Sequence, residues 1–102
     1  MNDNRLTEQL AGQVFGWRAM SDRFLTSGRS WTPKWRFCPL TELPDAFKLL
    51  DHAADRYTLS RDDTTFTAEV EIGSRRGNAV GEDMARTIVI AVARALDLDV
   101  DE

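Results

Sequence analysis

Thr65-Phe66-Thr67-Ala68-Glu69-Val70-Glu71-Ile72 is the stretch that decides the fold class, because apolar and polar side chains alternate along it without a break. A period of two places the two sets of side chains on opposite faces of a β-strand. One face of the predicted sheet is therefore buried and the other is at least half wet, a pattern typical of an antiparallel sheet.

Turn-forming residues on both sides of this stretch predict a short sheet of two or three strands. A preceding strand is expected over residues 57–60, with a turn over 61–64. A second turn is expected over 73–77, followed by a short third strand over 78–80.

Three segments have the apolar spacing of amphipathic helices. The first ends at Gly16, the second begins near Thr41 as N-cap, and the third covers about residues 82–96. We therefore predict an α+β domain over residues 1–96, in the order helix, loop, helix, two or three strands, helix. Residues 97–102 form an acidic C-terminal tail.

Composition favours a globular protein of the reducing cytoplasm. The chain has 102 residues, a formal net charge of −4 and one cysteine, Cys38, so no disulfide forms within it. It shows neither a signal peptide nor an apolar run long enough for a membrane span. The acidic balance argues against a protein that coats nucleic acid.

The segment Gly16–Leu40 is the main functional candidate. It holds all three tryptophans, Trp17, Trp31 and Trp35, and five basic residues against a single acid. The tryptophans fold back as an aromatic lid over the core, or some stay outside as a contact surface, since Trp and Arg dominate binding hot spots. The candidate binding residues are Trp31, Trp35, Arg29, Lys34 and Arg36.

No catalytic residue, metal ligand or cofactor site is predicted. Cys38 and His52 are the only thiol and imidazole, but nothing supplies an orienting group or an oxyanion site. The glycine-rich stretch 73–81 lacks the ending of a phosphate loop. The aspartates of the tail lack the glycine and the terminal glutamate of a calcium loop.

The last helix offers a second candidate surface. Ile90 lies away from the main apolar stripe, one turn from Arg86 and one turn from Arg94. These three residues either pack beneath the rest of the chain or form a self-association patch of a homodimer.

Four short motifs, spread over nearly the whole chain, carry a resemblance to a known family. They are Gly16-Trp17, Pro39-x-Thr41, Ala46-Phe47 and Ala91-x-x-x-Ala95. With them the chain resembles the phage ABA-sandwich domain family, small proteins encoded by tailed phages and prophages. It departs from the family in Pro44 and in a longer basic loop. The resemblance implies a phage origin and helices on both faces of a sheet, and it implies no particular activity.

Two functional hypotheses follow. The first is a non-catalytic phage or prophage accessory protein in the host cytoplasm, which contacts another protein or a second copy of itself. The alternative is weak binding of single-stranded nucleic acid through the basic, Trp-rich loop 17–37, with bases stacked on the indoles.

Overall fold

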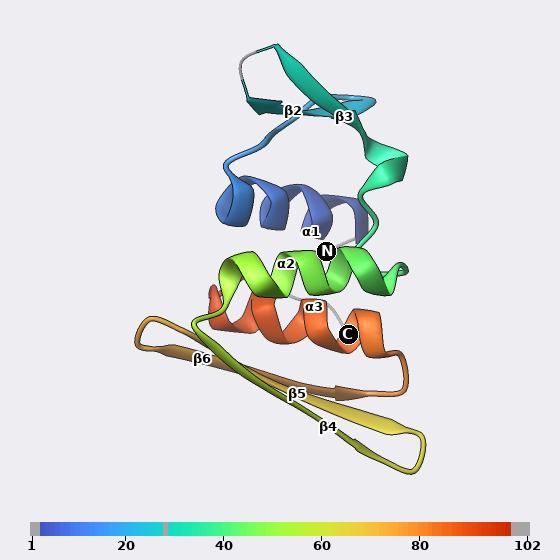
Figure 1. Cartoon of the computed structure of the whole chain (residues 1–102), viewed down its shortest axis with the longest axis vertical. Helices are drawn as coiled ribbons and strands as arrows, with labels where there is room; N and C mark the ends of the chain where they lie inside the picture. The colour runs from blue at the N-terminus through green and yellow to red at the C-terminus, as the bar shows by residue number, and fades with distance from the viewer. Residues whose placement is uncertain (1–2, 28, 99–102) are drawn as a thin grey trace.

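Residues 3–27 and 29–98, which the computed structural model describes, form three α-helices and two three-stranded antiparallel sheets. The layers follow one another along the longest axis (Figure 1): the first sheet, then α1, then α2 with α3, then the second sheet. The α+β class is confirmed. The expectation of a single short sheet is wrong.

The elements of the first half are α1 (Asp3–Leu10), a π-helical turn η1 (Ala11–Phe15), β1 (Arg18–Ala19), β2 (Arg23–Ser27), β3 (Ser30–Pro33) and a 3-10 turn η2 (Lys34–Arg36). Those of the second half are α2 (Leu43–Ala53), β4 (Arg56–Asp62), β5 (Thr65–Ile72), β6 (Arg75–Gly81) and α3 (Met84–Ala95).

The second sheet has the order β4-β5-β6 and longer strands than the sequence predicts. Each hairpin turn has two residues, and each begins with a positive φ, 55° at Asp63 and 61° at Gly73. Arg61 and Arg75, which the sequence predicts to lie in turns, belong to strands β4 and β6. Exposed positions of a strand tolerate such charged side chains. The third strand, expected as optional, is a full member of the sheet.

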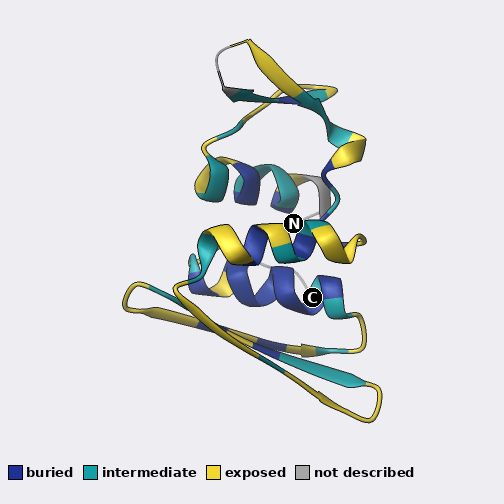
Figure 2. Ribbon diagram, viewed as in Figure 1, coloured by how far each residue is buried: buried dark blue, intermediate teal, exposed yellow. Residues whose placement is uncertain are grey.

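Helix α3 is the centre of the core (Figure 2). It packs on β5 and β6, and α2 packs against it on the other side. Gly77 of β6 allows the close approach, because a Cβ there would overlap the backbone of Ala91 and Ala95. The Ala91-x-x-x-Ala95 motif therefore has a packing role: its small residues bring the helix backbone onto the sheet.

The predicted self-association patch on α3 is not an exposed apolar surface. Ile90 is only 7% exposed, because α3 is enclosed between the sheet and the other helices. Arg86 is half-buried, and exposed Arg94 donates from Nη1 to the carbonyl oxygen of Asn78 at 2.7 Å. This face therefore offers a partner no hydrophobic centre.

The second sheet has one covered face, as the alternation predicts. Ala68 and Val70 are buried beneath α3, whereas Glu69, on the opposite face, is exposed. In the described part of the chain the helices lie between the two sheets, so the layering implied by the resemblance, helices on both faces of one sheet, is not observed.

The first helical segment, α1 followed by η1, ends at Gly16 as predicted, whereas the second helix begins later than predicted. Gly16 caps the π-helical turn with a φ of 73°. Helix α2 begins at Leu43, and Thr41 is not its N-cap. The carboxylate of Asp45, in the first turn, accepts a hydrogen bond from the Cys38 amide at 2.9 Å, which ties the helix to the preceding loop.

The first sheet, β1-β2-β3, replaces most of the expected loop. Strands β2 and β3 form a hairpin, with Leu25 paired to Trp31. The two residues of β1 are too few to produce an alternation, so the sequence does not reveal that strand. Of the acidic tail, residues 99–102 lie outside the described residues. Within the described residues 3–27 and 29–98, no helix is both long enough and apolar enough to cross a membrane.

Candidate functional site

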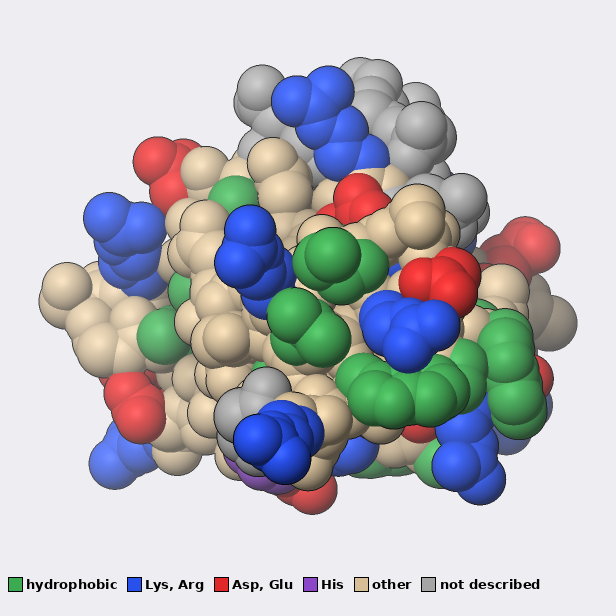
Figure 3. Space-filling view, turned by 90° about the horizontal axis from the view of Figure 1, so that it is seen from above, with side chains coloured by type: hydrophobic (Ala, Val, Ile, Leu, Met, Phe, Trp, Pro, Cys, Tyr) green, Lys and Arg blue, Asp and Glu red, His purple; other side chains and the backbone are tan. Residues whose placement is uncertain are grey.

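We refer to residues 18–36, which form β1, β2, β3 and η2, as the basic ribbon. It forms one end of the molecule, beyond α1 (Figure 1). Figure 3 looks onto this end and shows hydrophobic side chains beside Lys and Arg side chains. Antiparallel pairing places Arg18, Leu25 and Trp31 in one row across the ribbon, on the same face.

An aromatic cluster anchors the basic ribbon to the body of the protein. Trp17 stacks on Phe15 with ring centroids 4.7 Å apart, and it lies 5.7 Å from Phe24 and 5.3 Å from Phe37. Phe24, in β2, is 1% exposed and points away from the outer row. Trp17 is therefore the lid residue that the sequence allowed for.

Trp31 stays outside this cluster. Its side chain is 50% exposed, and the guanidinium of Arg23 lies 4.2 Å from its ring centroid. Arg23 also donates to both carboxylate oxygens of Asp22, at 3.0 and 3.1 Å. This bidentate contact lowers the pKa of Asp22 and raises that of Arg23. The ion pair thus holds a cation against one side of an exposed indole.

Trp35 is the most exposed large hydrophobic residue among those described, at 75%. It lies in η2, where the guanidinium of Arg36 is 5.7 Å from its ring centroid. Arg36 and Arg29 are both exposed, and the described part of the chain shows no salt bridge to either. Trp31 and Trp35 are therefore two large apolar side chains that are exposed to solvent, each beside a guanidinium group.

Lys34 has a different role from the one the sequence suggested. Its ammonium lies 2.6 Å from a carboxylate oxygen of Glu8, in α1, and both side chains are about one third exposed. This salt bridge neutralises Lys34 and ties η2 to the first helix. Of the five predicted binding residues, the structure thus leaves Trp31, Trp35, Arg29 and Arg36 outward and solvent-exposed.

Cys38 and His52 do not form a nucleophilic pair in the structure. The thiol donates to the carbonyl oxygen of Trp35 at 3.3 Å, whereas Nδ1 of His52 lies 3.0 Å from the carbonyl oxygen of Lys48. The His52 ring packs against Phe15. Burial, followed by the nearby Asp45 and Glu42 carboxylates, raises the pKa of Cys38, which disfavours the reactive thiolate.

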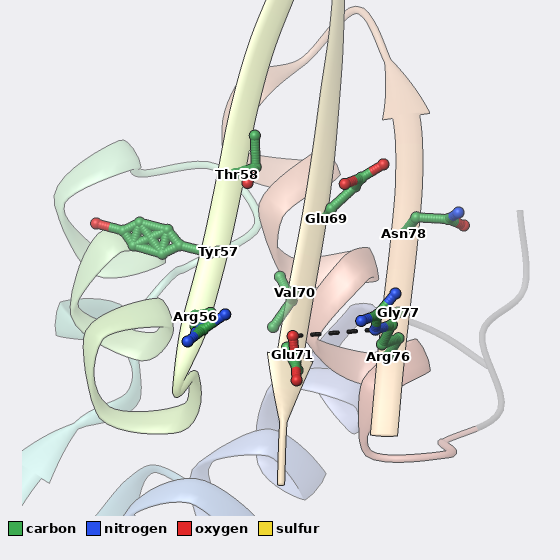
Figure 4. Close-up of a pocket in the computed structure, with 9 residues that line it drawn as sticks. All are labelled: Arg56, Tyr57, Thr58, Glu69, Val70, Glu71, Arg76, Gly77 and Asn78. Atoms are coloured by element: carbon green, nitrogen blue, oxygen red, sulfur yellow. Dashed lines mark ion pairs between the residues drawn. The ribbon is translucent and has the colours of Figure 1, made fainter. Parts of the chain in front are cut away.

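Two hollows were not foreseen from the sequence. The larger, about 440 Å3, lies on the second sheet around Arg56, Glu69, Glu71, Arg76 and Asn78 (Figure 4). A long salt bridge crosses it, 3.9 Å between Arg76 and Glu71. The charged residues around this hollow come from three different strands, and the register between the strands brings them together. The spacing of residues within one strand therefore could not have predicted the hollow.

The smaller hollow, about 290 Å3, lies between α1 and the basic ribbon. The Lys34–Glu8 salt bridge, Phe24, Phe37 and Cys38 contribute to its wall. Within residues 3–27 and 29–98, no group of three histidine, cysteine or acidic side chains is arranged to hold a metal ion.

Comparisons with known proteins show a likeness of fold and no match in sequence. No protein-family model matches the sequence, and no curated protein is significantly similar to it. A crystal structure described as a phage protein from Bacillus cereus has the same fold, with a TM-score of 0.78. The alignment covers 99% of this chain and 93% of that chain, at 14% sequence identity.

Proposed function

We propose that this is a non-catalytic phage accessory protein that binds another protein through the basic ribbon. The observation that carries the proposal is the exposure of Trp31 and Trp35 beside the exposed Arg29 and Arg36. Indole and guanidinium groups supply much of the binding energy in protein interfaces. The shared fold with a phage protein supports the phage association, and the host cytoplasm is the proposed location.

Three further features favour binding over catalysis. The thiol has a raised pKa, the imidazole lies elsewhere, and the large hollow is lined by mutually neutralising charges. The ribbon, by contrast, combines exposed apolar area with positive charge. An acidic or mixed protein surface with an apolar centre complements this composition.

The test is a double substitution, Trp35→Ala with Arg36→Ala, in the full chain. The wild-type protein is used to capture partners from phage-infected host cells, and each captured protein is purified and titrated directly. We expect the double variant to bind at least about tenfold more weakly, since a hot-spot residue contributes roughly 2 kcal/mol. Its thermal unfolding should match that of the wild type.

Arg76→Ala is the matched control, because Arg76 is an exposed arginine on the opposite sheet. It should leave partner binding unchanged. Equal affinity of wild type and double variant for every purified partner would contradict the proposal. Salt-dependent binding of a single-stranded oligonucleotide that is lost in the double variant would assign the ribbon to nucleic acid instead.

A further inference from the structure

We propose that β4 pairs with β4 of a second copy of this chain, which joins two second sheets into one six-stranded antiparallel sheet. This inference concerns the end of the molecule opposite the basic ribbon and does not depend on the proposed function. It begins with the place of β4 in the sheet. The strand order β4-β5-β6 leaves β4 at an edge, and six of its seven residues are exposed.

Backbone geometry shows which groups of β4 are available. A two-residue turn joins Asp62 to Thr65, so these residues form a hydrogen-bonded pair. Antiparallel ladders alternate, so the even-numbered residues of β4 bond to β5. The backbone groups of Tyr57, Leu59 and Arg61 therefore point outward from the free edge.

The two edges of this sheet differ. At the β6 edge, Arg94 donates to the carbonyl oxygen of Asn78, and α3 packs over the strand. In the described part of the chain no helix packs as closely over β4, and the side chain of Arg61 donates locally to the carbonyl oxygen of Asp63 at 3.1 Å. Tyr57 extends away from β5 (Figure 4). Tyr57 is 42% exposed. Long, unprotected edge strands are templates for pairing with another chain.

The sequence of β4 is complementary to itself when two copies run antiparallel with Leu59 at the centre. Each residue then meets the one equally far from Leu59 in the partner. The facing pairs are Arg56 with Asp62, Tyr57 with Arg61, Thr58 with Ser60, and Leu59 with Leu59. Opposite charges, a cation beside an aromatic ring, two hydroxyls and two leucines are all favourable cross-strand pairs.

This register also matches the backbone. It makes Leu59 with Leu59 and Tyr57 with Arg61 the hydrogen-bonded pairs, so the outward groups form about six bonds. A shift by two residues in either direction breaks both Arg56–Asp62 pairs. An equivalent pairing of β6 would leave Arg75 and Arg76 without an acidic partner. Charge and backbone register therefore both favour the pairing of β4 with β4 of a second copy over a shifted register or a pairing through β6.

The test combines two charge reversals, Arg56→Asp and Asp62→Arg. Wild-type protein should shift from monomer to dimer in sedimentation equilibrium between about 10 μM and 1 mM. Each single variant places like charges opposite each other twice and should dimerise about tenfold more weakly or worse. The double variant, and an equimolar mixture of the two single variants, should recover the dimer, because each restores opposite charges in every pair.

A second measurement needs no substitution. Amide hydrogen exchange should become slower with rising concentration at Tyr57, Leu59 and Arg61, and stay constant at Thr58 and Ser60, which already bond to β5. A chain that is monomeric at 1 mM, single reversals without effect, or a double variant without recovery would each overturn the proposal. So would protection of the β4 amides that appears only when another protein is added.

Discussion

The two sheets of this molecule are built on different principles. The second sheet is held by strict alternation and by a buried helix, with Ala68 and Val70 packed under α3. The basic ribbon is held by an aromatic cluster and by the Lys34–Glu8 salt bridge. The difference teaches that the least periodic region of the chain is also the one that leaves two of its three tryptophans largely exposed.

The contrast is clearest among the three tryptophans. Trp17 is part of the cluster that attaches the ribbon, whereas Trp31 and Trp35, 14 and 18 residues further along the chain, are half or more exposed. Identical side chains in one segment therefore have structural and surface roles. The predictions below separate these roles.

The largest effect is expected where the second sheet meets α3. A side chain at Gly77 overlaps the backbone of Ala91 and Ala95, and backbone cannot move aside as a flexible side chain can. Gly77→Val should therefore lower the free energy of unfolding by at least about 3 kcal/mol. Urea denaturation measures the loss. The neighbouring exposed Asn78→Ala is the control and should stay within about 0.5 kcal/mol. A stable Gly77→Val protein would contradict the close packing.

The next effect separates the tryptophans. Trp17→Ala should lower the free energy of unfolding by roughly 2 to 3 kcal/mol, because it removes ring contacts with Phe15, Phe24 and Phe37 from a partly exposed site. Trp35→Ala should change it by less than about 0.5 kcal/mol. Urea denaturation monitored by circular dichroism compares them. Equal losses would mean that Trp35 belongs to the core and that the division proposed here is wrong.

A smaller effect tests the link between the basic ribbon and α1. A double-mutant cycle of Glu8→Gln and Lys34→Met should give a coupling energy of about 0.5 to 1 kcal/mol, since the pair is only partly shielded from water. The coupling should fall as salt is added. The pair Arg76 and Glu71, 3.9 Å apart on the exposed sheet face, is the matched control and should couple more weakly.

The smallest effect concerns the ion pair beside Trp31. Because Arg23 holds the pKa of Asp22 below 3.8, this carboxylate stabilises the fold above pH 3.8. That contribution is lost as the pH falls through the lower, folded-state pKa. Carbon-13 NMR titration should show the depressed midpoint, and Arg23→Gln should return it toward 3.8. An unchanged midpoint in Arg23→Gln would exclude the contact as the cause.

Prediction from the sequence succeeded where a pattern repeats. The period of two in β5 correctly indicated an antiparallel sheet with one covered face. It underestimated β4 and β6, because charged residues such as Arg61 and Arg75 occur equally well in turns and in exposed strands. The π-helical turn before Gly16 and the two-residue strand β1 are too short to leave any periodic signal.

The candidate site was likewise predicted only in part. Sequence composition located the Trp- and Arg-rich segment, but it could not assign each side chain to the inside or the outside. Lys34 was included among the binding residues, although its partner Glu8 is distant in sequence. For Ile90 the sequence left packing and self-association open, and the structure encloses this residue between the second sheet and α2.

By itself, the sequence determined the α+β class, the helical stripes and the segment in which aromatic and basic residues gather. These follow from local periodicity and composition, which need only neighbours along the chain. Only the tertiary structure decided which tryptophans are buried, which cations are neutralised and which strand edge stays open. Those properties depend on contacts between segments far apart in sequence, and no local pattern encodes them.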